Sequence, residues 1–142
     1  MTWTPLTTAE RAAFEAELRT CIGTPWRHMG RQGCGYGHQT GLDCVGLLVR
    51  AALSVGRDPS DLELYGRAPN GTLESILTDR LGEPCEPSTG CIVLIRLPRE
   101  PSHVGYVTEA GTLLHAYNGG NRCVVEHPMG LWQKRIVRGW RV

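Results

Sequence analysis

The sequence has no long apolar run and no marked excess of charge of either sign. No segment approaches the ~20 apolar residues that a transmembrane helix needs. The formal net charge is +1 over 142 residues, so the overall charge gives no reason to expect nucleic-acid binding. The composition, with 41% hydrophobic and 20% charged residues, is that of a soluble globular protein. The length suits one domain, which we place at residues 1–142.

The amino terminus also lacks the pattern of an export signal. Residues 1–10 carry neither a basic region nor an apolar core, and a signal peptide has both. We therefore expect the protein to be made in a reducing cytoplasm. Its six cysteines are then not expected to form a disulfide framework, and several are explained as small buried apolar residues.

The first predicted helix follows Thr7. Thr7 and Glu10 have the spacing of a capping box, in which each side chain satisfies a backbone N–H at the start of a helix. Four apolar residues then follow at i, i+4, i+7 and i+8 and predict one buried stripe: Phe14, Leu18, Cys21 and Ile22. Gly23 and Pro25 end the helix.

A glycine-rich loop leads into a second helix. Residues 23–42 contain six glycines, too many for a regular element. Asp43 is a good N-cap, and residues 44–55 are nearly all apolar. A helix that is apolar on every side is a buried one. A short amphipathic helix ending at Gly82 is predicted further along, after a polar stretch that holds Pro59 and Pro69.

Strands follow the helices. Five are predicted, at residues 91–97, 103–108, 112–117, 123–126 and 135–142. The carboxyl-terminal stretch gathers four basic side chains, which we expect to form a solvated strand face: Lys134, Arg135, Arg138 and Arg141. Helices first and an antiparallel sheet afterwards indicate an α+β fold, with the helices packed on the sheet.

Cys44 is the best candidate nucleophile among the six cysteines. It occupies the first turn of the predicted buried helix, directly after the N-cap Asp43. The helix dipole and the free backbone N–H groups at that position favour a thiolate and lower the pKa of a cysteine. A structural cysteine at this position is the alternative interpretation.

A nucleophilic cysteine needs a base, and His103 and His115 lie in consecutive predicted strands. With a two-residue turn between these strands, the two side chains would face opposite sides of the sheet. A three-residue loop at 109–111 instead pairs Gly105 with His115 and puts both histidines on one face as diagonal neighbours. A Cys–His–His arrangement therefore predicts an odd-length loop or a bulge here. The alternative is a pair of surface histidines on a hairpin.

Four segments, in this order, resemble the NlpC/P60 family of cysteine peptidases. They are Gly23-Thr-Pro-Trp-Arg27, Gly41-Leu-Asp-Cys-Val-Gly-Leu47, Ser102-His-Val-Gly105 and Leu114-His-Ala116. The resemblance runs from about residue 22 to the carboxyl terminus and implies a papain-like fold. It also implies a catalytic triad of Cys44, His103 and His115, with no cofactor and no metal.

The resemblance implies hydrolysis of peptidoglycan stem peptides, typically between D-glutamate and diaminopimelate. Cys44 would attack the carbonyl group, with its own backbone N–H as an oxyanion donor. His103 would protonate the leaving amine and then activate water, while His115 holds the imidazole in position. Trp26 and Asp43 are the substrate contacts that the resemblance implies, and Asp43 also fits a purely structural role as the N-cap.

Three positions depart from the residues that the family usually has. Trp26 stands where the family commonly has tyrosine, and its indole offers one donor and no acceptor. Val45 replaces the usual serine after the nucleophile, and Cys91 replaces an acidic residue before the first strand of the sheet.

More narrowly, the chain resembles the short NlpC/P60 proteins of phage tail tips and gene transfer agents. The residues that carry this resemblance are the Trp26-Arg-His28 loop, the glycine-rich approach to Cys44 and the ending Trp132-Gln-Lys-Arg-Ile136. It implies a virion protein, made in the host cytoplasm, whose partners are tail-tip hub proteins. Aromatic and basic residues are enriched at interface anchors, so we expect docking through the basic carboxyl-terminal strand, with Trp132 and Trp140, and through an exposed Trp3.

Other functions remain open at this level. A metal or cluster module would use Cys34, His38 and Cys44, or Cys85 and Cys91, although the closely spaced Cys-x2-Cys pairs of most zinc sites are absent. A non-catalytic tail-tip component with the same fold is a second alternative. An amidase or acyltransferase on that fold is a third.

Overall fold

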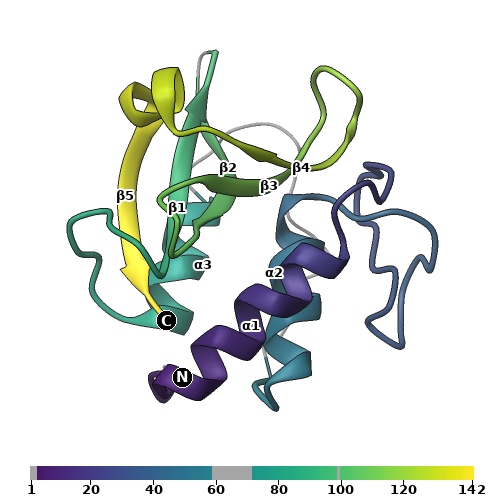
Figure 1. Cartoon of the computed structure of the whole chain (residues 1–142), viewed down its shortest axis with the longest axis horizontal. Coiled ribbons are helices and arrows are strands. Elements are labelled where there is room, and N and C mark those ends of the chain that lie inside the picture. The colour runs from purple at the N-terminus through teal and green to yellow at the C-terminus, as the bar shows by residue number, and fades with distance from the viewer. Residues whose placement is uncertain (1–2, 59–71, 99) are drawn as a thin grey trace.

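The computed structural model describes residues 3–58, 72–98 and 100–142. The helices are α1 (Thr8–Thr20), α2 (Cys44–Ser54) and α3 (Thr72–Leu81). The strands are β1 (Cys91–Leu97), β2 (Glu100–Val107), β3 (Leu113–Tyr117), β4 (Cys123–His127) and β5 (Ile136–Arg141), with a 3-10 helix, η1 (Gly130–Arg135), before β5. Figure 1 confirms the predicted α+β arrangement, with helices before the sheet. The predicted polar stretch with Pro59 and Pro69 lies outside the described residues.

The strands form one antiparallel sheet in the order β4-β3-β2-β1-β5. The carboxyl-terminal strand therefore does not pair with its predecessor β4 but crosses to the opposite edge and pairs with β1 (Figure 1). Irregular register between Leu94 and Ile95, and again between Ile95 and Arg96, interrupts both ladders of β1. Such bulges increase the local bend and twist of a sheet.

The start of α1 is the predicted capping box. The Thr7 hydroxyl accepts from the backbone N–H of Glu10 at 3.1 Å, and the Thr7 N–H donates to the Glu10 carboxylate at 2.9 Å. Phe14 and Leu18 are fully buried, as the periodicity predicts. Ile22 is 46% exposed, because it follows the end of the helix and no longer lies on the buried stripe.

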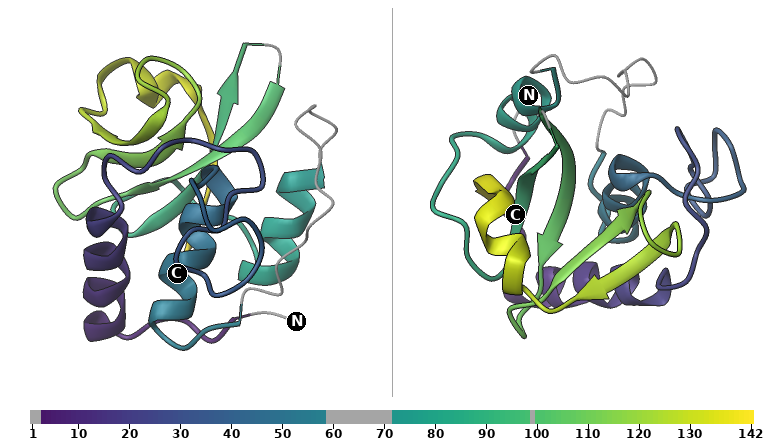
Figure 2. Two further views of the ribbon diagram at one scale, coloured as in Figure 1. Left: turned by 90° about the vertical axis from the view of Figure 1, so that its right-hand side faces the viewer. Right: turned by 90° about the horizontal axis from the view of Figure 1, so that it is seen from above.

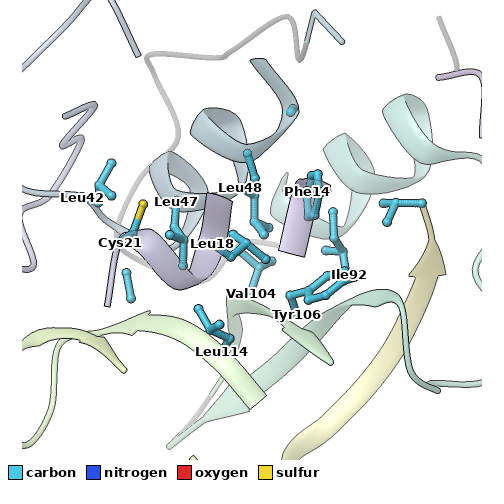
Figure 3. Close-up of a cluster of buried hydrophobic side chains, with 14 of the residues drawn as sticks. Phe14, Leu18, Cys21, Leu42, Leu47, Leu48, Ile92, Val104, Tyr106 and Leu114 are labelled. Atoms are coloured by element: carbon cyan, nitrogen blue, oxygen red, sulfur yellow. The ribbon is translucent and has the colours of Figure 1, made fainter. Parts of the chain in front are cut away.

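The main core lies between the helices and one face of the sheet. Figure 3 shows apolar side chains of α1 and α2 pointing at those of the strands. The helices contribute Phe14, Leu18, Leu47 and Leu48, and the sheet contributes Ile92, Val104, Tyr106 and Leu114. Trp140 also lies in this core and is completely buried. The prediction that Trp140 is a docking anchor is therefore wrong, and Trp3 is partly buried against the same core rather than exposed.

The opposite face of the sheet has a smaller core of its own. It contains Cys91, Val93, Ile95, Val107 and Leu113. Trp132 of η1 packs against it; this 3-10 helix was not predicted and occupies the segment before β5 (Figure 2). The Trp132 ring is partly buried against side chains of the sheet, and its role as a docking anchor stays a prediction.

The glycine-rich loop projects beside the amino-terminal end of α2 (Figures 1 and 2). It contains only isolated β-bridges, such as that between Trp26 and Leu42, as its composition predicts. A Cβ atom at Gly46 would lie 2.1 Å from the carbonyl oxygen of Gly30. The loop therefore packs directly on the first turn of α2 because residue 46 has no side chain. Among the described residues, no helix is both long and apolar enough to cross a membrane.

Candidate active site

Cys44 is the first residue of α2, and Asp43 caps the helix as predicted. The Asp43 Oδ1 atom accepts from the backbone N–H of Gly46 at 2.8 Å. The thiol of Cys44 therefore lies where the N–H groups of the first helical turn have no partner within the helix. Backbone N–H groups of Cys44 itself, Val45 and Val104 contact the sulfur. The sulfur thus meets β2 at the residue that follows His103.

Asp43 is held by more than the helix. Its carboxylate also accepts from the Arg31 guanidinium at 3.0 Å and from the backbone N–H of Met29 at 2.8 Å. Asp43 and Arg31 are both almost completely buried, at 3% and 2% exposure. Both carboxylate oxygens therefore accept hydrogen bonds from the glycine-rich loop or the first turn of α2. Contact between Asp43 and a substrate stays a prediction.

Burial, and not the helix dipole, dominates the acidity of Cys44. Loss of hydration raises the pKa of the Cys44 thiol to about 12, and the negative charge of Asp43 adds to this rise. The three backbone N–H groups act in the opposite direction but are outweighed. The expectation of a lowered pKa is therefore wrong for the resting protein. Cys44 rests as a neutral thiol and needs a base to become a nucleophile.

The register of the β2–β3 hairpin agrees with the predicted histidine pair. Tyr106 pairs with Leu114, so Gly105 stands opposite His115. The hairpin closes through a hydrogen bond from the Thr108 N–H to the Thr112 carbonyl, which leaves a three-residue loop at 109–111. His103 and His115 accordingly share one face, and their Nε2 and Nδ1 atoms are 2.7 Å apart. The odd-length loop predicted from the sequence is confirmed.

A third histidine continues this contact. The Nε2 atom of His115 lies 2.9 Å from the Nδ1 atom of His127 at the end of β4. Trp132 stacks on the His127 ring at 5.4 Å between centroids and meets the His115 ring edge-on at 4.8 Å. Tyr117 stacks on the His115 ring at 5.2 Å between centroids and also meets the Trp132 ring edge-on at 5.1 Å. Sequence reasoning missed His127, although twelve residues separate each histidine from the next.

Burial keeps the inner two histidines neutral. It lowers the pKa of His103 to about 4, and burial together with the neighbouring His103 and His127 lowers the pKa of His115 to about 2. At neutral pH the site thus contains a thiol and neutral imidazoles. A neutral imidazole is able to accept a proton, which is the state that a general base requires.

The stability of the fold should fall as the pH is lowered from 7 to 5. In the unfolded chain the histidines bind protons near pH 6.5, whereas buried His103 stays neutral down to about pH 4, so protonation favours unfolding in this window. For His103 alone the loss is about 2 kcal/mol. Urea denaturation at several pH values measures it. His103→Gln should flatten the dependence, while His38→Gln, at an exposed histidine, should leave it unchanged; equal slopes in both variants would contradict this account.

Trp26 lies at the junction of the glycine-rich loop and β4. Its backbone N–H donates to the Arg122 carbonyl at 2.8 Å, the Arg122 guanidinium lies 5.9 Å from its ring centroid, and the His28 ring stacks at 6.5 Å. The Trp26 side chain is partly buried against the main core. A role for Trp26 in substrate binding stays a prediction.

The alternative metal site finds no support in the geometry. Among residues 3–58, 72–98 and 100–142, no group of three or more His, Cys, Asp or Glu side chains is arranged to hold a metal ion. The Cys34 thiol is directed at backbone carbonyl groups of Gln32 and Gly46. Cys85 and Cys91 approach each other, with their sulfur atoms 3.9 Å apart.

The fold is that of NlpC/P60 domains. No family model and no curated protein matches the sequence. The NlpC/p60 domain of the peptidoglycan hydrolase SagA has a similar structure, with a TM-score of 0.65 and 22% identity over 93% of this chain and 98% of its own. The P60 domain of antigen MAP1204 from M. avium subspecies paratuberculosis has a TM-score of 0.61 and 19% identity over 94% of each chain.

A third similar structure is described as lacking catalysis. RipD from Mycobacterium tuberculosis is named a non-catalytic NlpC/p60 domain protein adapted to peptidoglycan binding. It has a TM-score of 0.62 and 17% identity over 94% of this chain and 97% of its own. The fold thus occurs both in hydrolases and in at least one protein without catalysis, so the function of this chain has to be argued from its own side chains.

Proposed function

We propose that this protein is a cysteine peptidase that cleaves the stem peptides of peptidoglycan through an acyl-enzyme at Cys44. The observation that carries the proposal is the placement of the Cys44 thiol. It lies at a helix amino terminus, against the strand that bears the hydrogen-bonded pair of His103 and His115. The fold it shares with the domain from the peptidoglycan hydrolase SagA supports peptidoglycan as the substrate.

The reaction begins with a neutral thiol. Because burial favours neutral Cys44 and neutral His103, the thiol proton moves to the imidazole as the sulfur attacks the carbonyl carbon. Backbone N–H groups around the sulfur, including that of Cys44, stabilise the negative oxygen of the tetrahedral intermediate, an effect of about 100- to 1000-fold per donor.

The second half of the reaction releases the product. The imidazolium of His103 gives its proton to the leaving amine, and the peptide bond breaks to leave a thioester on Cys44. His103 then takes a proton from water, whose oxygen attacks the thioester, and the thiol is regenerated with a free carboxylate on the stem peptide. His115 holds the His103 ring through its 2.7 Å contact throughout.

Release of soluble fragments from dye-labelled sacculi tests the proposal. The folded protein should solubilise the dye in proportion to its concentration, and Cys44→Ala, which lacks the nucleophile, should release none. If folded protein releases no dye from sacculi of several stem-peptide types, the hydrolase proposal fails.

A non-catalytic peptidoglycan-binding protein is the second candidate. The raised pKa of Cys44 and the existence of RipD, whose name describes this behaviour, favour it. Co-sedimentation with insoluble sacculi separates the two candidates, because a binder is retained on the polymer without releasing fragments from it.

We also propose that the protein is carried at a phage-type tail tip, where it docks onto a hub protein. The resemblance of the Trp26-Arg-His28 loop and the Trp132–Ile136 segment to tail-tip proteins supports this location. Delivery by a particle would raise the local concentration of the polymer around the enzyme. With Trp140 buried, the exposed basic residues Arg138 and Arg141 are the remaining docking candidates on β5. Absence of the chain from purified particles would reject the location and leave the hydrolase proposal intact.

A further inference from the structure

The histidine pair of the site is the inner part of a longer hydrogen-bonded chain. His103, His115 and His127 lie on β2, β3 and β4, and each Nε2 atom is directed at the Nδ1 atom of the next ring, at 2.7 Å and 2.9 Å. His103 and His115 are buried, at 5% and 0% exposure, whereas His127 is partly exposed. The chain of rings therefore runs from buried His103 to partly exposed His127 at the surface.

With all three rings neutral, these contacts have only two consistent proton arrangements. A neutral imidazole has one N–H and one acceptor nitrogen, so each contact needs a donor on one side only. In the forward arrangement all three rings carry the proton on Nε2, so His103 donates to His115 and His115 donates to His127. In the reverse arrangement all three carry it on Nδ1, so His127 donates to His115 and His115 donates to His103. The choice made by one ring thus fixes the other two.

The proposed reaction requires the forward arrangement. The Nε2 atom of His103 is engaged with His115, so Nδ1 is the nitrogen that remains to accept the thiol proton. Nδ1 of His103 accepts the thiol proton only if the ring carries its own proton on Nε2. His115 then accepts that proton's hydrogen bond with Nδ1, and its own proton lies on Nε2, where it donates. That last donation needs an acceptor, and the acceptor is the Nδ1 atom of His127.

We propose that His127 is a positioning residue of the active site, which fixes the tautomers of His115 and His103 by accepting a hydrogen bond at its Nδ1 atom. Trp132 and Tyr117 hold the chain in place. Trp132 is parallel to the His127 ring within 16°, and Tyr117 is parallel to the His115 ring within 15°. The effect of this arrangement on catalysis rests on the proposed function. The proton arrangement itself is a property of the resting protein and is measured without any substrate.

The test uses two variants at position 127. An asparagine side chain places an amide where the imidazole has its Nδ1 atom, and its carbonyl oxygen is able to accept in place of that nitrogen. His127→Asn should therefore keep the forward arrangement, and His127→Ala should lose it. His38→Ala, at an exposed histidine outside the chain, is the matched control.

The first readout is the ¹⁵N NMR signature of the histidine tautomers at pH 7. Wild-type protein, His127→Asn and His38→Ala should each show His103 and His115 protonated on Nε2. His127→Ala should show a mixture of the Nε2–H and Nδ1–H forms at His115. Protonation of His115 on Nδ1 in the wild type, or unchanged tautomers in His127→Ala, would overturn the inference whether or not the protein cleaves peptidoglycan.

The second readout is the cleavage rate. In serine proteases, replacing the residue that orients the catalytic histidine leaves that histidine in the wrong tautomer and lowers kcat about 10⁴-fold. His127 is one residue further from the base, and we expect a loss of about tenfold in His127→Ala. The loss should be in kcat rather than in KM, with recovery in His127→Asn. A loss confined to KM, or none at all, contradicts the positioning role. Absence of cleavage by the wild type rejects the proposed function and leaves the tautomer result standing.

Discussion

Replacing Cys44 by alanine is expected to abolish the release of peptidoglycan fragments, with a loss of at least about 10⁴-fold in kcat. The nucleophile and its base act as one unit, and removal of either in a protease triad has effects of this size or larger. No other cysteine of the described residues has its sulfur at a helix amino terminus with a histidine-bearing strand against it. Initial rates on dye-labelled sacculi provide the measurement.

The matched control for this variant is Cys123→Ala. Cys123 is partly buried and lies at the start of β4, so a similar volume is removed from the same region without touching the thiol of the site. It should keep wild-type activity within a factor of two or three, and both variants should have wild-type circular dichroism spectra. Retained activity in Cys44→Ala would eliminate the acyl-enzyme mechanism.

Replacing Asp43 by alanine is expected to destabilise the fold by about 3–5 kcal/mol. The change removes the Asp43 carboxylate that faces the buried Arg31 guanidinium and that accepts from the N–H groups of Gly46 and Met29. Breaking a buried ion pair by removing one partner is strongly destabilising because the remaining charge loses favourable interactions in the interior. Urea denaturation measures the free energy of unfolding, and the Tm should fall by roughly 10 °C or more.

Two further variants separate charge from capping. Asp43→Asn keeps an oxygen for the Gly46 N–H but removes the charge opposite Arg31, so it should fall between the wild type and Asp43→Ala. Arg138→Ala breaks the exposed ion pair with Glu74 and should change stability by less than about 1 kcal/mol. An Asp43→Ala protein as stable as Arg138→Ala would show that the Asp43–Arg31 pair does not hold the loop on α2.

The parts of the fold that were predicted correctly depend on local sequence. The capping box at Thr7 and the N-cap at Asp43 are each defined within four residues, and both are present in the structure. The hairpin register was predictable because the loop length alone decides which histidines share a face. Local signals thus predicted Cys44 at the start of a helix and the two histidines on one face of the hairpin.

The errors concern long-range contacts. Trp140 is buried because β5 pairs with β1 rather than with β4. The order of strands in a sheet depends on contacts between distant segments, so no single segment of the sequence predicts it. His127 was missed because the predicted fourth strand ended at residue 126, one residue before the position that pairs with Leu113. The pKa of Cys44 depends on burial beneath distant residues, whereas the sequence indicated only its place in the helix.

Mass spectrometry of the soluble products from purified sacculi tests the central claim most directly. Hydrolysis of a stem peptide by Cys44 predicts fragments with one new carboxyl terminus and one new amino terminus within the stem, formed by wild-type protein and absent with Cys44→Ala. Cleavage at the bond between the sugar and the stem would instead indicate an amidase. Transfer of the stem fragment to an added amine, with no free carboxylate, would indicate an acyltransferase. The same stem fragments from Cys44→Ala and wild-type protein would contradict the account.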